Sequence, residues 1–213
     1  MNDIGYDSWT LGNHEFNFGL YVLERAVKTA KMKVLAGNIY NTKTKARAYD
    51  AYTIITKEGI RVAIIGMIMP NIPRWEGAYP DHYKSLEFKN PAEETKKVIA
   101  ELKGKADVRI GSFHLGLDTE YSDHDGSRAV ILANPELDLV ISGHAHRDIP
   151  AIIIGRTLLV DPSYKGARVS KIILTLHKEN NEWNIREKIP ENINTRLYKE
   201  DGDLEKKYER IHR

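Results

Sequence analysis

The feature that most constrains the fold is a nearly continuous apolar run over residues 61–69. Strands that are buried on both faces have this composition, because neither side of the sheet meets water. The run contains a glycine and is far too short to cross a bilayer. It therefore predicts an internal strand of a sheet that other elements cover on both sides.

Strand-like and helix-like segments alternate around this run. Asn90 and Pro91 mark a helix start, since Asn is a favoured N-cap and Pro suits the first helical position. Apolar residues at helical spacing predict another helix over residues 19–31. Up to residue 142 the predicted strands are 8–11, 33–36, 52–56, 61–69, 107–113 and 138–142, and the predicted helices are 19–31, 91–103 and 127–133.

The last third of the chain has a different character. Strand-like segments follow one another without helices at residues 151–154, 157–160, 169–177 and 183–188. Strand–helix units that give way to a meander predict an α/β fold, with two packed mixed β-sheets flanked by helices. We expect one domain over residues 1–190, followed by a polar tail or surface helix over residues 191–213.

Composition excludes several functional classes. The 213 residues, 41% of them hydrophobic, suffice for one domain with a core. The absence of cysteine excludes disulfides, thiolate metal sites and cysteine nucleophiles. Lys and Arg exceed Asp and Glu by two and form no basic stripe, so we expect no nucleic-acid polymer as partner and no membrane span. Nothing in the sequence indicates the oligomeric state.

Polar groups at the ends of three predicted strands suggest a metal site. Asn13 and His14 follow the first strand, His114 follows residues 107–113, and Gly143-His144-Ala145-His146 follows residues 138–142. Imidazole nitrogen and amide oxygen together suit Zn, Mn, Fe or Co. His114 alone is as readily explained as a core histidine, but paired histidines after a glycine are badly placed for packing. We expect the three loops to meet at one edge of a sheet.

These motifs, in this order, resemble the calcineurin-like metallophosphoesterase superfamily. The residues that carry the resemblance are Gly12-Asn13-His14-Glu15, then His114 with Gly116, then Gly143-His144-Ala145-His146. Tyr6-Asp7, residues 16–19 and Asn38-Ile39 are similar to one bacterial branch, the 5′-nucleotidases and 2′,3′-cyclic-nucleotide 2′-phosphodiesterases. The similarity covers about residues 1–178, which implies a metallophosphoesterase domain within the 1–190 unit.

The resemblance implies two adjacent divalent metal ions that activate water for phosphoester hydrolysis. It assigns Asn13, His114 and His144 to one metal and His146 to the other. It places His14 beside the leaving-group oxygen, where a cationic imidazole protonates or stabilises that oxygen. The implied partner is a small-molecule nucleotide, and no substrate-binding residue is assigned.

The chain also departs from the family pattern. Members begin with a strand carrying Asp-x-His and a second carrying Gly-Asp, and neither block precedes Asn13. One metal site is therefore largely missing, and we expect an N-terminally truncated chain with little activity. The alternative is a non-catalytic remnant that serves as a binding or structural module. Relatives are often secreted, periplasmic or attached to the cell wall, but the sequence assigns no compartment.

One position bears on the choice of substrate. Asn17 stands where the 5′-nucleotidase branch typically has an aspartate that orients the catalytic histidine. An amide orients an imidazole but favours its cation less than a carboxylate does. This favours 2′,3′-cyclic nucleotides, with 5′-nucleotides second. The residues after Asn192 are too few and too polar for a base-binding domain.

Three remaining features carry little weight in the assignment of function. The acidic loop with Asp118, Glu120, Asp123 and Asp125 either lines an entrance or binds calcium, or is simply solvated, which we favour. Trp75 and Tyr79 either contact a substrate base or pack a loop, and packing is favoured. The other four histidines are expected at the surface: His82, His124, His177 and His212.

Overall fold

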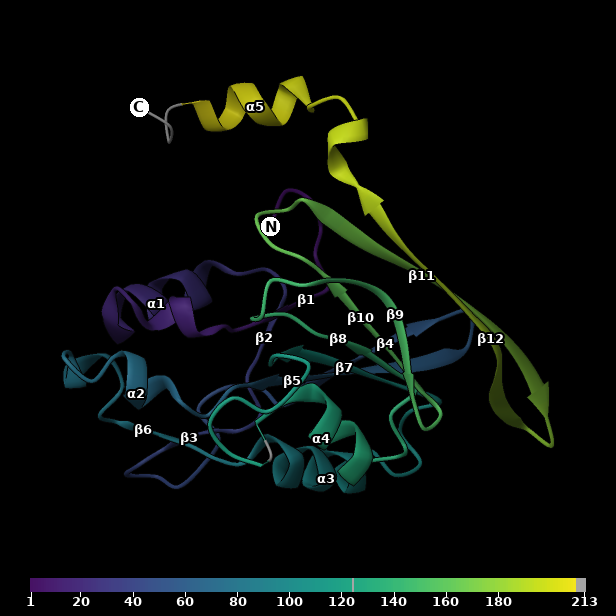
Figure 1. The fold of residues 1–213 in the computed structure, drawn as a ribbon, viewed down its shortest axis with the longest axis horizontal. Helices are drawn as coiled ribbons and strands as arrows, with labels where there is room; N and C mark the ends of the chain where they lie inside the picture. Colours follow the sequence, from purple (N-terminus) through teal and green to yellow (C-terminus); the bar gives the residue numbers. More distant parts are fainter. Residues whose placement is uncertain (124, 210–213) are drawn as a thin grey trace.

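The structure is a computed structural model that describes residues 1–123 and 125–209. Two helices, a six-stranded sheet and two two-stranded sheets with a further helix lie in succession, while a third two-stranded sheet lies to one side and the C-terminal helix stands apart (Figure 1). The helices are α1 (Gly19–Thr29), α2 (Ile72–Trp75), α3 (Pro91–Glu101), α4 (Ser127–Ala133) and α5 (Gly202–Tyr208), with 3-10 helices η1 (Asn13–Phe16), η2 (Pro80–His82) and η3 (Thr195–Leu197).

The six-stranded sheet forms the centre of the molecule. Its order is β4-β5-β7-β8-β10-β9, and β5, β7, β8 and β10 run parallel to one another. The antiparallel strands β4 and β9 lie at its two edges. The strands are β4 (Tyr52–Lys57), β5 (Ile60–Ile68), β7 (Val108–His114), β8 (Leu139–Ile141), β9 (Asp148–Ile154) and β10 (Thr157–Pro162). The apolar run is thus an internal strand, as predicted.

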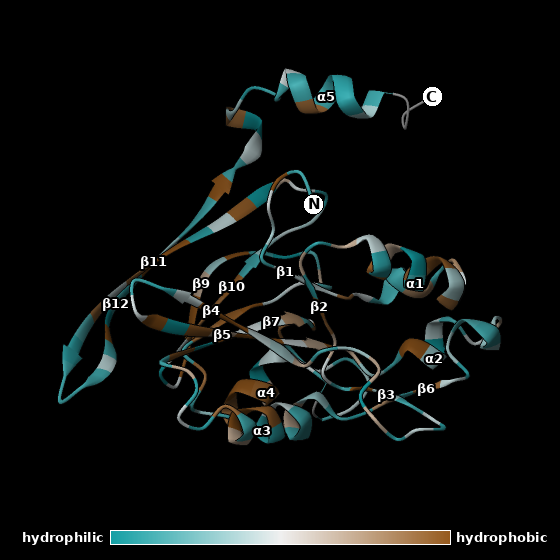
Figure 2. Ribbon diagram, turned by 180° about the vertical axis from the view of Figure 1, so that it is seen from behind, coloured by the Kyte–Doolittle hydropathy of each residue, from teal (hydrophilic) through white to brown (hydrophobic). Residues whose placement is uncertain are grey.

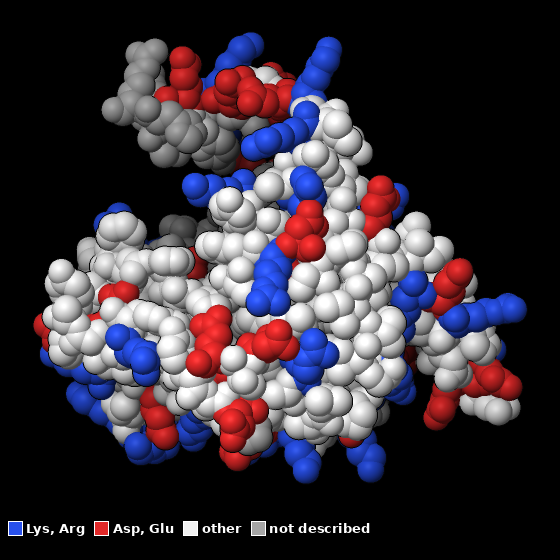
Figure 3. Space-filling view, viewed as in Figure 1, with Lys and Arg blue, Asp and Glu red and all other residues white. Residues whose placement is uncertain are grey.

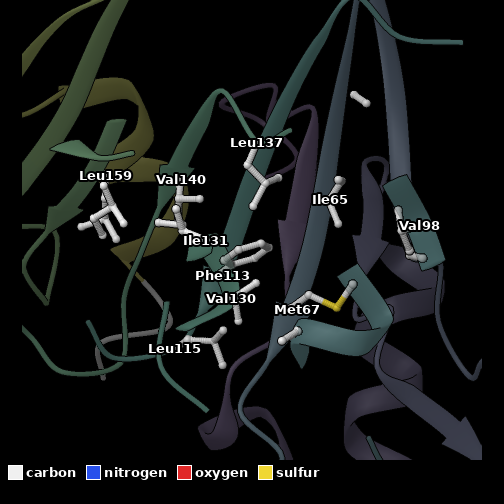
Figure 4. Packing of buried hydrophobic residues seen from close by; sticks show 14 of the residues in the cluster. Ile65, Met67, Val98, Phe113, Leu115, Val130, Ile131, Leu137, Val140 and Leu159 are labelled. Atoms are coloured by element: carbon white, nitrogen blue, oxygen red, sulfur yellow. The ribbon is translucent and has the colours of Figure 1, made fainter. Parts of the chain in front are cut away.

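The main hydrophobic core lies between this sheet and helices α3 and α4. Figure 2 shows the apolar residues of α4 and of the central strands, and Figure 4 shows how the side chains interdigitate. Met67 of β5 and Phe113 of β7 face Val98 of α3 and Val130 of α4. The N-cap prediction for α3 is confirmed, since the Asn90 side chain accepts hydrogen bonds from Ala92 N and Glu93 N.

The opposite face of the sheet is covered by two separate two-stranded sheets. One is parallel and pairs β1 (Ser8–Thr10) with β2 (Lys33–Leu35), with α1 packed outside it. The other is the hairpin of β11 (Arg168–Glu179) and β12 (Glu182–Asn194), which projects from the body (Figure 1). Ile172 of β11 packs on Leu139, Leu158 and Val160 of the large sheet. The predicted fold class, a mixed α/β fold with several sheets flanked by helices, is confirmed.

Some short elements were not predicted. Strands β3 (Ile39–Asn41) and β6 (Leu86–Phe88) pair antiparallel with each other, and α2 is a single turn. Buried Asn38 holds this region together, because its amide accepts from Ile68 N and donates to the carbonyls of Ile68 and Lys89. These elements depend on pairing between distant segments, which local periodicity does not reveal.

The segment expected to follow the domain, residues 191–213, begins inside strand β12. β12 continues to Asn194, so the boundary expected at residue 191 falls within the hairpin, and α5 lies in the segment expected as a polar tail or surface helix.

Lysines and arginines are interspersed with acidic residues over the face shown in Figure 3. None of the helices in the described part of the chain has the length and hydrophobicity needed to cross a bilayer.

Candidate metal centre

The predicted ligands lie on three loops at one edge of the molecule. β1 leads into η1 with Asn13 and His14, β7 ends at His114, and β8 leads into the turn with His144. β7 and β8 are parallel neighbours, so their carboxyl ends meet at the same edge of the sheet. The hydroxyl of Thr10 donates to Ser112 Oγ over 2.9 Å and ties β1 to β7.

Three side chains converge at this edge. Asn13 Oδ1 lies 2.8 Å from His114 Nε2 and 3.2 Å from His144 Nδ1, and the two imidazole nitrogens are 3.3 Å apart. In sequence these residues are separated by 101 and 30 positions. We call Asn13, His114 and His144 the donor trio.

The donor trio has the spacing of a metal shell. Two donors that each bind one ion at about 2.1 Å, roughly at right angles, lie about 3.0 Å apart. One amide oxygen and two imidazole nitrogens also suit a first-row divalent metal. Within the described residues, no cluster of three His, Asp or Glu side chains is arranged to hold an ion, and the donor trio contains two histidines and one amide.

His114 is prepared to act as a neutral donor. Burial, followed by the charges of His144, His14 and His146, lowers the pKa of His114 from its ordinary value to about 4. The imidazole is therefore uncharged at neutral pH, and binding a cation there does not require prior loss of a proton.

Gly12 makes room for the His114 ring. A Cβ at this position would lie 2.7 Å from His114 Cε1 and 2.9 Å from Nδ1. The Gly12 N–H donates to Glu15 Oε2 over 2.6 Å and starts the 3-10 turn that carries Asn13. Phe16 at the end of this turn is fully buried and packs edge-on against Phe88, which anchors the turn.

The turn after β8 has an unusual backbone. His144 and His146 both lie in the left-handed region, with φ of 69° and 57°. Such positions cost a non-glycine residue about 1–3 kcal/mol and concentrate at functional sites. Ser142, just before the turn, donates to the Leu115 carbonyl over 2.6 Å, so the turn is fixed to the loop that follows His114.

Glu120 contacts His144 from behind. Its Oε2 lies 3.3 Å from His144 Nε2. When Nε2 carries the proton, the lone pair of His144 Nδ1 is left on the side of Asn13 and His114. Buried Asp125 shapes this part of the loop by accepting hydrogen bonds from the backbone N–H groups of residues 120–122. The interpretation of the acidic loop as simply solvated is therefore wrong for Asp125, which is buried, whereas Glu120 is exposed and also contacts His144. The loop position after His114 was the only sequence signal for this contact.

The His146 side is different. The His146 ring is exposed and stacks on Tyr164, with 4.9 Å between ring centroids and 20° between planes. Asp161 on β10 is fully buried; burial raises its pKa to about 6, against a partial lowering by the Ser163 N–H and by the charge of His146. Asp161 Oδ2 has no hydrogen-bond partner among the described residues.

His14 lies beside the donor trio with its ring exposed. The contact predicted for Asn17 is present, since Asn17 Oδ1 lies 2.7 Å from His14 Nδ1. Sequence reasoning missed two residues further along, Glu76 and His82, which continue from Asn17. No sequence signal linked them, because 59 positions separate Asn17 from Glu76.

The surface prediction for the other histidines has a mixed outcome. It is wrong for His82, whose side chain is 22% exposed and bonded to Glu76. His177 is exposed on the hairpin, as expected. His124 and His212 lie outside the described residues.

Trp75 both packs the loop and reaches the candidate site. It contacts two hydrophobic clusters, and its ring centroid lies 5.5 Å from that of His144 and 5.7 Å from that of Tyr121. The guanidinium of Arg74 lies over the ring of Tyr121, 4.4 Å from its centroid. Tyr79 is 62% exposed and stacks on His82. Packing, the favoured interpretation, therefore applies to Trp75.

The sequence matches the family model of calcineurin-like phosphoesterases over residues 4–148. It is 36% identical over 157 residues to a 5′-nucleotidase of Vibrio cholerae, which covers 70% of this chain and 28% of that protein. It is 32% identical over 162 residues to a 2′,3′-cyclic-nucleotide 2′-phosphodiesterase/3′-nucleotidase of Haemophilus influenzae, covering 70% and 24%. The chain thus spans about a quarter of the length of these curated relatives.

A solved structure has the same fold. The crystal structure of the calcineurin-like phosphoesterase YfkN from Bacillus subtilis superposes with a TM-score of 0.89 at 24% identity. The match covers 100% of this chain and 71% of that one.

Proposed function

Because this chain belongs to the calcineurin-like phosphoesterase family, we propose that it hydrolyses nucleotide phosphoesters with divalent metal. The curated relatives carry the names of nucleotidases and cyclic-nucleotide phosphodiesterases, which supports a nucleotide as substrate. We assign 2′,3′-cyclic nucleotides first and 5′-nucleotides second, since Asn17 occupies the position next to His14 that a carboxylate takes in the 5′-nucleotidase branch.

The observation that carries the proposal is the convergence of the donor trio. Calcineurin-like phosphoesterases use divalent metals, and Asn13, His114 and His144 offer three neutral donors with metal-shell spacing. His146 is assigned to a second ion. Two such ions, when bound, neutralise phosphoryl oxygens and activate a water molecule.

His14 supplies the proton for the leaving group. Its Nδ1 is held by Asn17, and Nε2 remains to face the substrate at the edge where the donor trio lies. In the reaction, water oxygen bonds to phosphorus and one water proton passes to solvent, while the bond from phosphorus to the sugar oxygen breaks. A cationic His14 gives its Nε2 proton to that sugar oxygen, which avoids release of an alkoxide.

The test combines metal binding with hydrolysis. Mn²⁺ binding is measured by calorimetry, and rates are measured with bis-p-nitrophenyl phosphate, a 2′,3′-cyclic nucleotide and a 5′-nucleotide. We expect a low rate, because only His146 is assigned to the second metal. We also expect His14→Ala to lower that rate by about 100-fold with metal affinity retained. His177→Ala, on the hairpin, is the matched control and is expected to change neither quantity.

Three outcomes would contradict parts of the proposal. Equal rates for the native chain and His14→Ala would remove the role of His14. A rate that is normal for a phosphodiesterase would contradict the expected weak activity. Metal binding without hydrolysis of any of the three substrates would favour the alternative, a non-catalytic binding module.

A further inference from the structure

We propose that Glu76 determines which nitrogen of His14 carries the proton, acting through the amide of Asn17. Glu76 is a positioning residue in this scheme, and its relevance to hydrolysis rests on the proposed function of His14. The placement of the proton itself rests on the hydrogen bonds alone.

Four side chains form one continuous chain of hydrogen bonds. His14 Nδ1 lies 2.7 Å from Asn17 Oδ1, and Asn17 Nδ2 donates to Glu76 Oε1 over 2.7 Å. Glu76 Oε2 lies 2.8 Å from His82 Nδ1. We call this series the His14 relay: His14, Asn17, Glu76 and His82.

The chemistry of the groups fixes the direction of every bond. An ionised carboxylate only accepts, so Asn17 must present its NH₂ group to Glu76. The Asn17 oxygen is then turned to His14 and accepts the proton of Nδ1. His14 is thereby held with Nδ1 protonated and with Nε2 left for the substrate side.

Without the carboxylate, the amide would have no preferred orientation. An asparagine amide exchanges its oxygen and nitrogen by rotating 180°, and only its partners select one state. If the NH₂ group faced His14, Nδ1 would have to accept, and the single proton of a neutral ring would move to Nε2. Glu76 thus acts on His14 although the two do not touch.

Glu76 is itself held firmly. It is 6% exposed, and a buried carboxylate is tolerated only when hydrogen bonds satisfy it. Asn17 and His82 use one oxygen each. The backbone also closes this region, since Glu76 N donates to the Ile72 carbonyl and Tyr79 N donates to the Glu76 carbonyl.

His82 at the far end is also confined. Its ring stacks on Tyr79, with 5.2 Å between centroids and 14° between planes. Gly19 is also close, since an added Cβ there would be 3.2 Å from His82 Cδ2. The His14 relay therefore ends in a packed group, which keeps Glu76 from rotating away.

The test reads the tautomer of His14 directly. Two-bond ¹H–¹⁵N NMR spectra of the ¹⁵N-histidine-labelled chain are recorded at about pH 8, where an ordinary imidazole is neutral. We expect native His14 to show the Nδ1–H pattern. A native Nε2–H pattern would overturn the proposal without any variant.

Two variants then test whether Glu76 orients the amide of Asn17 or only packs beside it. Glu76→Gln keeps the shape but offers a group that can donate or accept, so the Asn17 amide is free to rotate and an Nε2–H pattern of His14 should appear beside the Nδ1–H pattern. In Asn17→Asp/Glu76→Gln the carboxylate is moved next to His14 and the introduced glutamine amide donates to it, so the Nδ1–H pattern should return.

The controls make each result decisive. His177, on the hairpin, is the internal reference, and its pattern should be the same in all three proteins. Glu87→Gln removes an exposed carboxylate on β6 and is expected to leave His14 unchanged. An unchanged His14 in Glu76→Gln, or a failure of the double variant to restore Nδ1–H, would overturn the proposal. The readout needs neither metal nor turnover, so a failure of hydrolysis alone would contradict only the proposed function.

Discussion

Two histidines that are one residue apart, His144 and His146, lie in very different surroundings. His144 has one nitrogen in the donor trio and the other against Glu120, and its ring contacts Trp75. His146 is exposed and stacks on Tyr164. A single turn with two left-handed residues sends the side chains to different partners.

The surroundings of the two histidines differ in how well they hold an imidazole in place for the proposed metal. On the His144 side, three donors from three loops already stand at metal-shell distances, and a carboxylate fixes the tautomer of one of them. On the His146 side, the ring stacks on Tyr164, and the nearby carboxylate of Asp161 is fully buried. Metal affinity of this chain should therefore reside in the donor trio.

The largest expected effect separates the two histidines directly. His144→Ala removes a donor, which should weaken Mn²⁺ binding by at least about 100-fold, more than the usual cost of losing an outer-shell partner. His146→Ala should change the affinity by less than about threefold. Calorimetric titration of both variants measures this contrast. A comparable loss in His146→Ala would show that the two sides form one site.

The next effect tests the packing around His114. Gly12→Ala puts a methyl group 2.7 Å from the His114 ring and should weaken Mn²⁺ binding by about 30-fold through misplacement of the donor. Gly143→Ala is the matched control, because its added Cβ would lie 3.9 Å from His114 Nδ1. Thermal unfolding of both variants checks that the fold persists. Equal affinities would mean that the His114 ring is free to move.

Glu120→Gln tests the carboxylate behind His144. Residues that hydrogen-bond to a metal-binding histidine usually contribute between about tenfold and 100-fold to metal affinity. Because the Glu120 side chain is 32% exposed, we expect a loss of Mn²⁺ affinity at the lower end, about tenfold. Asp123→Asn removes the same charge from the same loop and serves as control. A similar loss of Mn²⁺ affinity in both variants would mean that Glu120 acts only through the negative charge of the loop and not through its contact with His144.

The smallest effect is on the protonation of His114. The charge of His144 contributes more than that of His146 to the low pKa of His114, which is about 4. A positive neighbour disfavours the imidazolium, so removing it raises the pKa. His144→Ala should therefore raise the pKa of His114 more than His146→Ala does. NMR titration of the ring protons, without metal, measures both shifts, and the opposite order would contradict the arrangement of the donor trio.

Much of this comparison was accessible from the sequence. The apolar run predicted the internal strand β5, and residues 127–133 form the predicted helix α4. The loops with Asn13, His114, His144 and His146 were predicted to meet because each follows a strand, and parallel strands end at a common edge. The family resemblance then placed the first three on one metal and His146 on the other. The assignment of these residues to metals stays a prediction, and so does that of His146.

What the sequence did not reveal depends on long-range contacts. Glu120 was one of several acidic residues in a loop, and in the fold its backbone N–H donates to Asp125 while its side chain contacts His144. His82 was expected to be an ordinary surface residue, but the fold brings it to Glu76. Neither contact has a periodic signature, since loop conformation is set by packing and turn hydrogen bonds.

The sequence by itself therefore determined most of the strands, though not β3 and β6, together with the main helices and the loops that carry the candidate ligands. These follow from local hydrophobic periodicity and from capping residues such as Asn90. Only the tertiary structure decided which acidic side chain of the loop contacts His144 and that a buried glutamate stands behind His14. Those choices follow from the φ angles of one turn and from hydrogen bonds between residues far apart in the chain, which exist only once the sheets have packed together.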